Sequence, residues 1–164
     1  EFDMITRQCK RNVKIAWNPG VIQLRNVKML VYFLKFVEVL LVNKDEAIEI
    51  VKRLKPKTPN TKLNNAKFLL KELRDLGPKK VVITQGGRGA VAQDELDKYY
   101  YLPAQSKKKR IVDTVGAGDA FFSGLMAGLI KFNKFDKALK LAIRNSASAL
   151  HRIGAQNGLL KIKL

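Results

Sequence analysis

The sequence predicts an α/β fold, a doubly wound and mainly parallel sheet flanked by helices. Two apolar runs, Val37–Val42 and Val81–Ile83, have the nearly continuous hydrophobicity of strands buried on both faces. Segments with apolar residues at helical spacing follow these runs, and strands that alternate with helices favour a parallel sheet. A glycine-rich segment, Asp113–Asp119, then opens a long apolar helix. Ligands of such sheets bind at the carboxyl ends of the strands, so we expect the functional residues there.

Periodicity and turn residues divide the first half of the chain into strands and helices. We expect, in order, a strand at Val13–Trp17 that stops at Asn18-Pro19-Gly20, a helix at Val27–Phe36, a strand at Val37–Val42, a helix opened by Asn43-Lys44-Asp45-Glu46, a loop at Lys55–Asn60 and one long helix at Thr61–Leu76. Gly77-Pro78 ends the last of these helices.

The second half continues the alternation and adds a hairpin. We expect a strand at Val81–Ile83, a loop at Thr84–Gly89, a hairpin at Ala90–Leu102 that turns near Asp94-Glu95, a short strand at Arg110–Val112, helices at Ala117–Lys131 and Asp136–His151, and a loop at Gly154–Gly158. The loops that follow Val42, Ile83 and Val112 carry the polar and glycine-rich residues, and all three would lie at carboxyl ends of strands.

Composition bounds the class of protein. The chain has 164 residues, 46% of them hydrophobic, which is enough for one folded domain. Cys9 is the single cysteine, no apolar run is long enough to span a membrane, and no apolar secretory segment is seen, so we expect a cytoplasmic protein. Lys and Arg number 32 against 14 Asp and Glu, a formal charge of +18. Either these are solvated surface lysines, or they attract polyanions; only Lys107–Arg110 forms a dense block.

The segment Asp113–Asp119 is the most informative motif. Gly116, Ala117 and Gly118 have small side chains or none, so the amides at the start of the following helix can form an anion hole. Asp119 lies in the first helical turn, where a carboxylate could take a proton from a hydroxyl that attacks a phosphate. It could also serve, alone or in addition, as a favourable charge at the positive end of the helix dipole.

Three further groups accompany this motif. Asp113 could brace the loop or help to hold a monovalent cation. Asn43 and Glu46, three residues apart at a strand-to-helix junction, could face hydrated Mg²⁺ and phosphates, or could form a helix cap. The loop that contains Thr84, Gly86 and Gly89 offers a hydroxyl and flexible backbone for close approach to a nucleotide.

These motifs, in this order, resemble the ribokinase-like family of sugar kinases, the phosphofructokinase B type. The resemblance covers about Val13 to about Leu160. It rests on Asp113-Thr114-Val115-Gly116-Ala117-Gly118-Asp119-Ala120-Phe121, on Asn43-Lys44-Asp45-Glu46, on Thr84-Gln85-Gly86-Gly87-Arg88-Gly89, and on Asn18-Pro19-Gly20 and Gly154-Ala155-Gln156. The first motif is highly specific, and the others corroborate it.

The resemblance implies ATP-dependent phosphorylation of an alcohol, usually a hydroxymethyl group of a sugar or nucleoside. It implies that Asp119 is the general base and that Gly116, Ala117 and Gly118 hold the transferred phosphoryl group. Asn43 and Glu46 would organise Mg²⁺ and phosphates, and ATP would be bound by Asn43, Thr84, Gly86, Gly89 and Gly118. A K⁺ ion would be held by Asp113, Val115, Ala149, Arg152 and Gly154. Asn145 stays outside this predicted site because its distance from Gly154 differs from that in some members.

The chain matches the carboxyl-terminal, ATP-binding and catalytic portion of such a kinase, residues 1–164. Members of the family are longer, and the sugar-binding residues and the lid belong to the part that precedes this match. We therefore expect the isolated chain to bind nucleotide weakly and to turn over sugar poorly, and a longer form could dimerise. Two alternatives remain open: a basic nucleic-acid-binding or scaffold protein that reuses the fold, and a kinase of the same fold that acts on a vitamin or nucleoside.

Overall fold

The computed structural model describes residues 13–105, 111–154 and 156–161. Strands and helices alternate along the chain, as predicted. In order they are β1 (Ile15–Trp17), α2 (Val21–Arg25), α3 (Val27–Leu34), β2 (Val37–Asn43), α4 (Lys44–Leu54), α5 (Asn60–Leu63), α6 (Ala66–Arg74), β3 (Lys80–Thr84), the 3₁₀ turn η1 (Gly86–Arg88), β4 (Ala90–Gln93), β5 (Tyr99–Leu102), α7 (Ala117–Phe132) and α8 (Phe135–Ala149).

The chain divides into two compact units. Unit 1 comprises Glu1–Ile83 and Ala92–Tyr99, and unit 2 comprises Thr84–Val91 and Tyr100–Leu164. Strands β4 and β5 contribute residues to both units.

The strands form a five-stranded sheet in the order β1-β2-β3-β4-β5. β1 and β2 are parallel, and Ile15 pairs with Val37 and Trp17 with Leu40. The predicted hairpin is confirmed, since β4 and β5 are neighbours and the Asp94 N–H donates to the Lys98 carbonyl at 3.1 Å across the turn that joins them.

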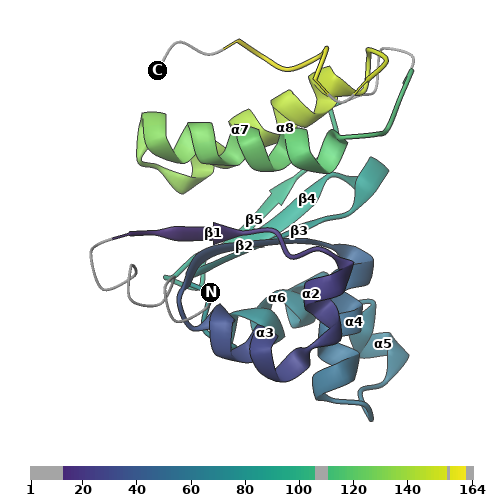
Figure 1. Cartoon of the computed structure of the whole chain (residues 1–164), viewed down its shortest axis with the longest axis vertical. Coiled ribbons are helices and arrows are strands. Elements are labelled where there is room, and N and C mark those ends of the chain that lie inside the picture. The colour runs from purple at the N-terminus through teal and green to yellow at the C-terminus, as the bar shows by residue number, and fades with distance from the viewer. Residues whose placement is uncertain (1–12, 106–110, 155, 162–164) are drawn as a thin grey trace. The chain divides into compact units, whose positions relative to one another are not determined.

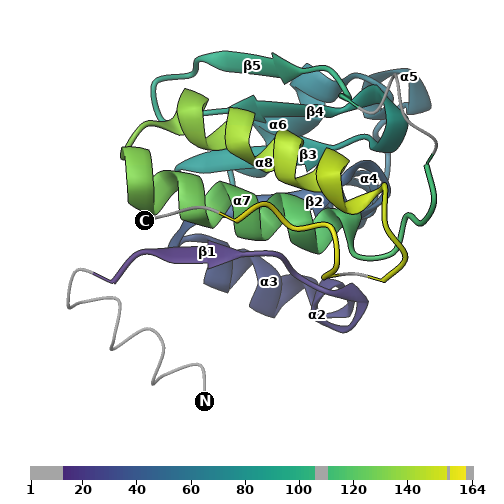
Figure 2. The same ribbon diagram turned by 90° about the horizontal axis from the view of Figure 1, so that it is seen from above.

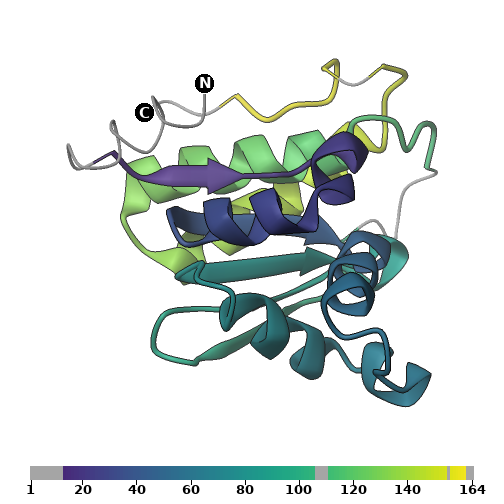
Figure 3. The same ribbon diagram turned by 60° about the horizontal axis from the view of Figure 1, so that its bottom comes forward.

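Unit 1 packs its helices on one face of β1, β2 and β3 (Figures 1 and 3). The apolar stripe of α4, Ala47, Ile50 and Val51, is buried, as the periodicity predicts. Helix α6 buries Leu69, Leu70 and Leu73, and the central residues of β2 and β3 are also buried. The core of unit 1 is therefore the layer between these helices and the strands, and removal of this apolar surface from water stabilises it.

Two expectations for unit 1 are corrected. The single long helix predicted at Thr61–Leu76 is two helices, α5 and α6, that are separated at Asn64 and Asn65. The Asn65 side chain accepts hydrogen bonds from the N–H groups of Lys67 and Phe68, so it caps α6 and favours a break over a continuous helix. Helix α2 is a short additional helix between the turn at Gly20 and α3.

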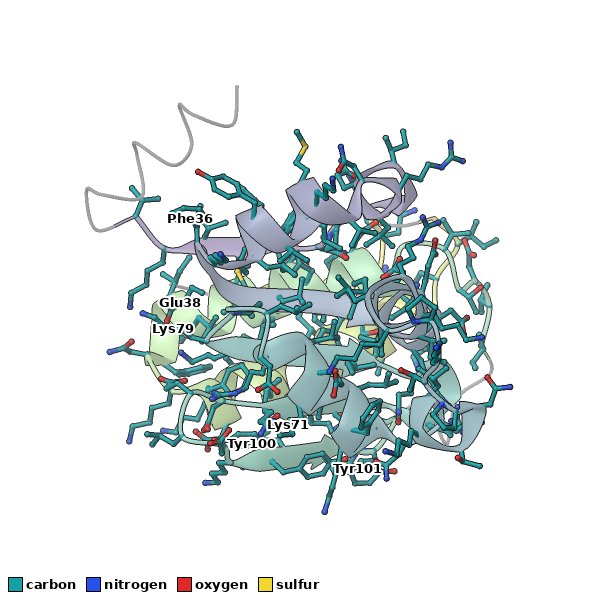
Figure 4. All side chains as sticks on the ribbon, turned by 90° about the horizontal axis from the view of Figure 1, so that it is seen from below. Phe36, Glu38, Lys71, Lys79, Tyr100 and Tyr101 are labelled. Carbon is teal, nitrogen blue, oxygen red and sulfur yellow. The ribbon has the colours of Figure 1, made fainter. Side chains whose placement is uncertain are left out.

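Charged side chains form a network at one edge of unit 1. Glu38 of β2 binds Lys79 at 3.0 Å and Lys80 at 3.1 Å, and Lys80 also reaches Glu95 at 2.9 Å. Figure 4 labels Glu38 and Lys79, which lie side by side. Burial opposes ionisation of Glu38, but the hydrogen bonds from the two lysines outweigh it and lower its pKa. Burial also opposes the charge on Lys80, whereas its two carboxylate partners outweigh burial and raise its pKa.

Unit 2 is built on the antiparallel pair α7 and α8, which lie side by side in Figures 1 and 2. Two glycines of α7 make the close approach possible. A Cβ atom on Gly128 would lie 2.6 Å from the Cα of Ala138, and one on Gly124 would lie 2.9 Å from the Cβ of Asn145. The Tyr100 ring of β5 packs edge-on against Phe135 of α8, with ring centroids 5.4 Å apart.

The expected strand at Arg110–Val112 is wrong for the residues that can be described. Ile111 and Val112 are not in a strand. Instead, the Val112 N–H donates to the Leu150 carbonyl at 2.8 Å, so the end of α8 takes the place of a neighbouring strand. Arg110, the basic block Lys107–Arg110, Cys9 and Ala155 lie outside the described residues. Within the described part of the chain, no helix has the length and apolar character needed to cross a membrane.

Candidate active site

The start of α7 leaves backbone donors open. Gly116 precedes the helix in the left-handed conformation, with φ of 77°, which an L side chain would strain. The Ala117 N–H donates to the Thr114 carbonyl at 3.3 Å, and the Ala120 N–H donates to the Gly116 carbonyl at 2.8 Å. Between them, the N–H groups of Gly118 and Asp119 have no protein acceptor among the described residues. Two adjacent open donors at the positive end of a helix form an anion-binding geometry.

Asp119 lies in the same helical turn as these donors. It is the acidic residue of the first turn of α7, and its side chain is exposed. Within the described residues no hydrogen bond or ion pair engages its carboxylate. The carboxylate is therefore available to a ligand, and its place in the first turn also gives it the favourable interaction with the helix dipole.

Asp113 ties two loops together. One carboxylate oxygen, Oδ1, accepts the Val115 N–H at 2.9 Å, and Oδ2 accepts the Gly154 N–H at 3.1 Å. These backbone hydrogen bonds, that from Val115 first, lower the pKa of Asp113. The predicted bracing role of Asp113 is thus visible as contacts that join the loop before α7 to the loop after α8.

The residues predicted for K⁺ lie on these two loops and at the end of α8. Asp113 and Val115 belong to the first loop, and Gly154 reaches Asp113 from the second. Ala149 is the last residue of α8, and its carbonyl accepts the Arg152 N–H at 3.3 Å. The carbonyl oxygens of such loops are the kind of ligand that replaces the hydration shell of a monovalent cation.

The loop that contains Thr84, Gly86 and Gly89 also belongs to unit 2. Gly86 and Gly89 have positive φ, 55° and 88°, so both predicted glycines adopt conformations that favour glycine. The Gln85 N–H donates to the Gly89 carbonyl at 2.7 Å, which closes the loop around η1. A Cβ atom on Gly89 would collide with the backbone of Leu102–Ala104, whereas one on Gly86 would meet open space.

Asn43 and Glu46 belong to unit 1, where they form a capping box at the start of α4. The Asn43 side chain accepts the Glu46 N–H at 2.9 Å, and Glu46 Oε2 accepts the Asn43 N–H at 2.8 Å. The helix-cap alternative is therefore correct as a structural role. The other carboxylate oxygen of Glu46, Oε1, remains available to a ligand. Mg²⁺ commonly binds one or two carboxylates together with waters and substrate phosphates. No group of three or more potential metal-ligating side chains occurs among the residues described here.

Two polar residues of α8 contact the start of α7: Ser146, which sequence reasoning missed, and Asn145, which it left outside the predicted site. Ser146 donates from Oγ to the Ala117 carbonyl at 2.9 Å. Asn145, which is only 4% exposed, donates from Nδ2 to the Ala120 carbonyl at 2.8 Å and accepts the Leu160 N–H on Oδ1 at 2.8 Å. Asn145 therefore has a structural role in unit 2, where it joins α7 to the segment that contains Leu160. No local pattern marks these contacts, because the partners on α7 lie more than 20 positions away in the sequence.

The sequence profile of the pfkB family carbohydrate kinases matches residues 7–162. The chain belongs to this family. The match covers nearly the whole chain, and it confirms the resemblance that the motifs at Asn43, Thr84 and Asp113 indicate.

Individual relatives of this pfkB chain include different kinases. An ATP-dependent 6-phosphofructokinase of Thermoanaerobacterium thermosaccharolyticum is 40% identical over 86 residues, 52% of this chain and 26% of the relative. A ribokinase of Lactococcus lactis is 26% identical over 159 residues, 96% of this chain and 46% of the relative. The chain thus spans about half of that ribokinase and a quarter of the phosphofructokinase.

Solved structures share the fold. A crystal structure of Anopheles gambiae adenosine kinase, in complex with P1,P4-di(adenosine-5) tetraphosphate, superposes with a TM-score of 0.79 at 24% identity and covers 96% of this chain and 48% of that one. Other structures of similar fold hold ADP, or ATP with Mg²⁺. The likeness confirms the predicted ribokinase-like α/β fold, with a mainly parallel sheet.

Proposed function

We propose that this pfkB chain is the carboxyl-terminal, ATP-binding and catalytic portion of a kinase that phosphorylates an alcohol group of a sugar or related small molecule. The observation that carries the proposal is the start of α7, where two open N–H groups lie beside the exposed carboxylate of Asp119. Phosphoryl transfer needs electrostatic stabilisation of the moving group and a base for the acceptor hydroxyl. Membership of the pfkB family supports this assignment.

The proposed mechanism divides the work among a few groups of this chain. The segment Gly116–Gly118 forms the anion hole, in which the open N–H groups of Gly118 and Asp119 and the helix dipole bind the phosphoryl group and stabilise its charge as it transfers. The Asp119 carboxylate orients the acceptor hydroxyl and accepts its proton as the oxygen attacks the terminal phosphorus of ATP. ADP leaves with the electron pair of the broken phosphorus–oxygen bond.

The remaining predicted residues hold the nucleotide and the cations in this proposal. Thr84, Gly86, Gly89 and Gly118 of unit 2 would bind ATP, and the family resemblance alone assigns Asn43 of unit 1 to the nucleotide. Glu46 and Asn43 would hold Mg²⁺, which would supply positive charge to neutralise the phosphates. A K⁺ ion would be held by Asp113 and Val115 of the loop before α7, by Ala149 at the end of α8, and by Arg152 and Gly154 of the loop after it, and it would help to hold the start of α7 in place.

The base is tested by a matched pair of variants in the complete gene product. Asp119→Asn should lower kcat by about 10²- to 10⁴-fold, because the amide cannot accept the proton, while ATP affinity changes little. Asp136→Asn removes a carboxylate from the first turn of α8 instead, and it should leave turnover within about twofold of the parent. Equal activity of the two variants would contradict the assignment. The same assay, run over sugars and nucleosides, identifies the acceptor.

Nucleotide binding is tested on the chain of residues 1–164 itself. We expect weak ATP binding that shifts the backbone amide resonances of Gly118 and Asp119, and we expect poor phosphorylation of sugars. Robust sugar phosphorylation by this chain alone would show that its acceptor site is complete, contrary to the proposal.

The role of Glu46 can be separated from its role in the cap. Glu46→Gln retains the capping box, since glutamine also serves at this position, and the free energy of unfolding should change by only about 0.5 kcal/mol or less. The variant loses the negative charge, so the gain in ATP affinity on addition of Mg²⁺ should fall about three- to tenfold. An unchanged Mg²⁺ dependence would assign Glu46 to the cap alone.

One observation favours a second candidate, polyanion binding. The exposed residues of α8 are Lys137, Lys140 and Arg144, all of them basic and spaced along one face of the helix. If this face binds nucleic acid, affinity should fall steeply with salt and should survive Asp119→Asn. Lys140→Gln should then reduce the salt dependence by about one unit of slope. Nucleic-acid binding that does not respond to Lys140→Gln, together with a loss of turnover in Asp119→Asn, favours the kinase.

A further inference from the structure

We propose that Ser146 is a positioning residue for the anion hole, and that it acts through the peptide group that joins Ala117 to Gly118. Its hydroxyl donates to the Ala117 carbonyl at 2.9 Å, although the two residues lie 29 positions apart in the sequence. The functional part of this inference rests on the proposed kinase function, because it assigns the Gly118 N–H to phosphate. The geometric part, that Ser146 orients this N–H, stands on the contact itself.

The planarity of the peptide bond couples the carbonyl that Ser146 binds to the next N–H group. The carbonyl of Ala117 and the N–H of Gly118 belong to one planar trans unit, so they point in opposite directions and turn together. A hydrogen bond that holds the carbonyl therefore also holds the direction of the N–H. The same bond polarises the peptide group and makes its N–H a stronger donor, since hydrogen bonds in a chain reinforce one another.

The position of this peptide gives the contact its significance. The Gly118 N–H is one of the two donors at the start of α7 that lack a protein acceptor among the described residues. A Cβ atom on Gly118 would meet no atom within 4 Å, so packing does not restrain this residue from that side. Ser146 supplies a restraint from the opposite end of the same peptide.

Asn145 holds the next part of the same turn. Its Nδ2 donates to the Ala120 carbonyl at 2.8 Å, one turn along from Ala117. It can come this close because position 124 is glycine. Its Oδ1 is occupied by the Leu160 N–H, so both polar ends of the amide are engaged. Adjacent residues of α8 thus hold two carbonyls of α7 on either side of Asp119, which fixes the turn before a ligand arrives.

The experiment compares three variants of the chain of residues 1–164. Ser146→Ala removes the hydroxyl, and Ser146→Thr retains a hydroxyl at the same position. Ser148→Ala is the matched control, because Ser148 lies on the same helix and its hydroxyl makes no hydrogen bond among the described residues. Backbone NMR gives the amide shifts of each variant without ligand. Titrations with ATP, and with inorganic triphosphate as a probe that lacks adenine, give the dissociation constants.

We expect Ser146→Ala to move the Gly118 amide nitrogen resonance upfield, because the preceding carbonyl loses a hydrogen bond. The dissociation constants for ATP and for triphosphate should both rise about three- to tenfold, by the same factor. Ser146→Thr should restore the shift and the affinity, and Ser148→Ala should change neither. An equal factor for both probes assigns the effect to phosphate binding and not to adenine.

Two results would overturn the proposal. One is an unchanged Gly118 resonance in Ser146→Ala, which means that the hydroxyl does not orient this peptide. The other is a loss of affinity in Ser148→Ala as large as in Ser146→Ala, which means that α8 acts only through general stability. If the parent chain binds neither probe, the phosphate-binding part fails together with the proposed function. The Gly118 shift then still decides the geometric part.

Discussion

The two units of this chain use polar side chains in different ways. In unit 1 the charged groups mainly neutralise one another, as in the network of Glu38, Lys79 and Lys80 and in the pairs along α4 and α6. In unit 2 the polar groups described at the site bind backbone instead: Asp113 holds two N–H groups, and Ser146 holds a carbonyl.

This difference indicates how a phosphate site can be prepared. An ion pair fixes two flexible side chains but leaves the backbone around them free, and on a surface it contributes little stability. A side chain that binds backbone fixes the direction of peptide dipoles, which are the groups that bind an anion at a helix start. We therefore expect unit 2 to be sensitive to changes in backbone geometry, and unit 1 to changes in charge.

The largest effect is expected at Gly89. Gly89→Ala should lower the free energy of unfolding by about 3 kcal/mol or more, because φ of 88° and ψ of −134° disfavour a side chain and the new Cβ would lie 2.7 Å from the Ala104 nitrogen. Gly87→Ala in the same turn should cost about 1 kcal/mol or less, since a Cβ there meets open space. Urea unfolding measures both. Similar costs for the two would show that the loop rearranges freely.

A smaller effect is expected at Asn145. Asn145→Ala should destabilise unit 2 by about 2 kcal/mol, because the Leu160 N–H loses its acceptor in a partly buried place and a cavity forms beside Gly124. Asn157→Ala serves as the control, since this exposed amide donates to the Ile153 carbonyl on the surface, and it should cost about 0.5 kcal/mol. Hydrogen exchange at the amides of α7 and α8 measures the loss of stability. Equal protection of these amides in the two variants would contradict the predicted role of Asn145.

Removal of a lysine charge should destabilise unit 1 more than unit 2. Lys80→Met keeps the apolar part of a side chain that is only 12% exposed, but it removes a partner of Glu38 and Glu95, while Glu38 keeps its second partner, Lys79, so we expect a loss of about 1 kcal/mol. Lys140→Met changes an exposed lysine of α8 for which the described residues offer no carboxylate partner, and it should be near neutral. Thermal unfolding at low and high salt compares them, and salt should narrow the difference.

The smallest effect concerns acid. Asp113 and Glu38 both have pKa values that are lowered in the folded chain, by backbone N–H groups in unit 2 and, against burial, by lysines in unit 1. A lowered pKa contributes stability that is present above the unfolded value, about 4, and is lost as the pH falls through the folded value. Asp113→Asn should therefore remove part of the acid sensitivity of unit 2 amides, and Glu38→Gln part of that of unit 1. Hydrogen exchange measured between about pH 2 and 5, a range that includes the unfolded pKa, compares the two variants. Loss of acid sensitivity in unit 1 for Asp113→Asn, or in unit 2 for Glu38→Gln, would contradict the prediction.

The elements that follow simple periodicity are those that sequence reasoning identified correctly. The apolar run of β2 and the stripe of α4 are examples, since each depends only on which faces are buried. The break between α5 and α6 was missed because a single side-chain cap, that of Asn65, outweighs a continuous apolar pattern. Ile111 and Val112 have the composition of a strand, but their partner is the carbonyl of Leu150 at the end of a helix, which no local pattern indicates.

The site residues divide in the same way, into those that a local pattern identifies and those that depend on tertiary contacts. Gly86, Gly89 and Gly116 were predicted as glycines with a special role, and each has positive φ. The cap formed by Asn43 and Glu46 was also foreseen as one of two alternatives. Ser146 was not, because its role depends on the antiparallel register of α7 and α8, which is set by close packing at Gly128 and Ala138. Contacts of this kind arise from tertiary structure and leave no spacing rule in the sequence.

The contact between Gly124 and α8 also limits how this pair of helices can evolve. A methyl group at 124 would lie 2.9 Å from the Asn145 Cβ and 3.0 Å from the Ala142 Cα. Every residue has a Cα atom, and every residue except glycine has a Cβ atom, so loss of the amide at 145 does not remove this overlap. Among descendants of this sequence we therefore expect glycine to persist at 124 wherever α7 and α8 keep this spacing.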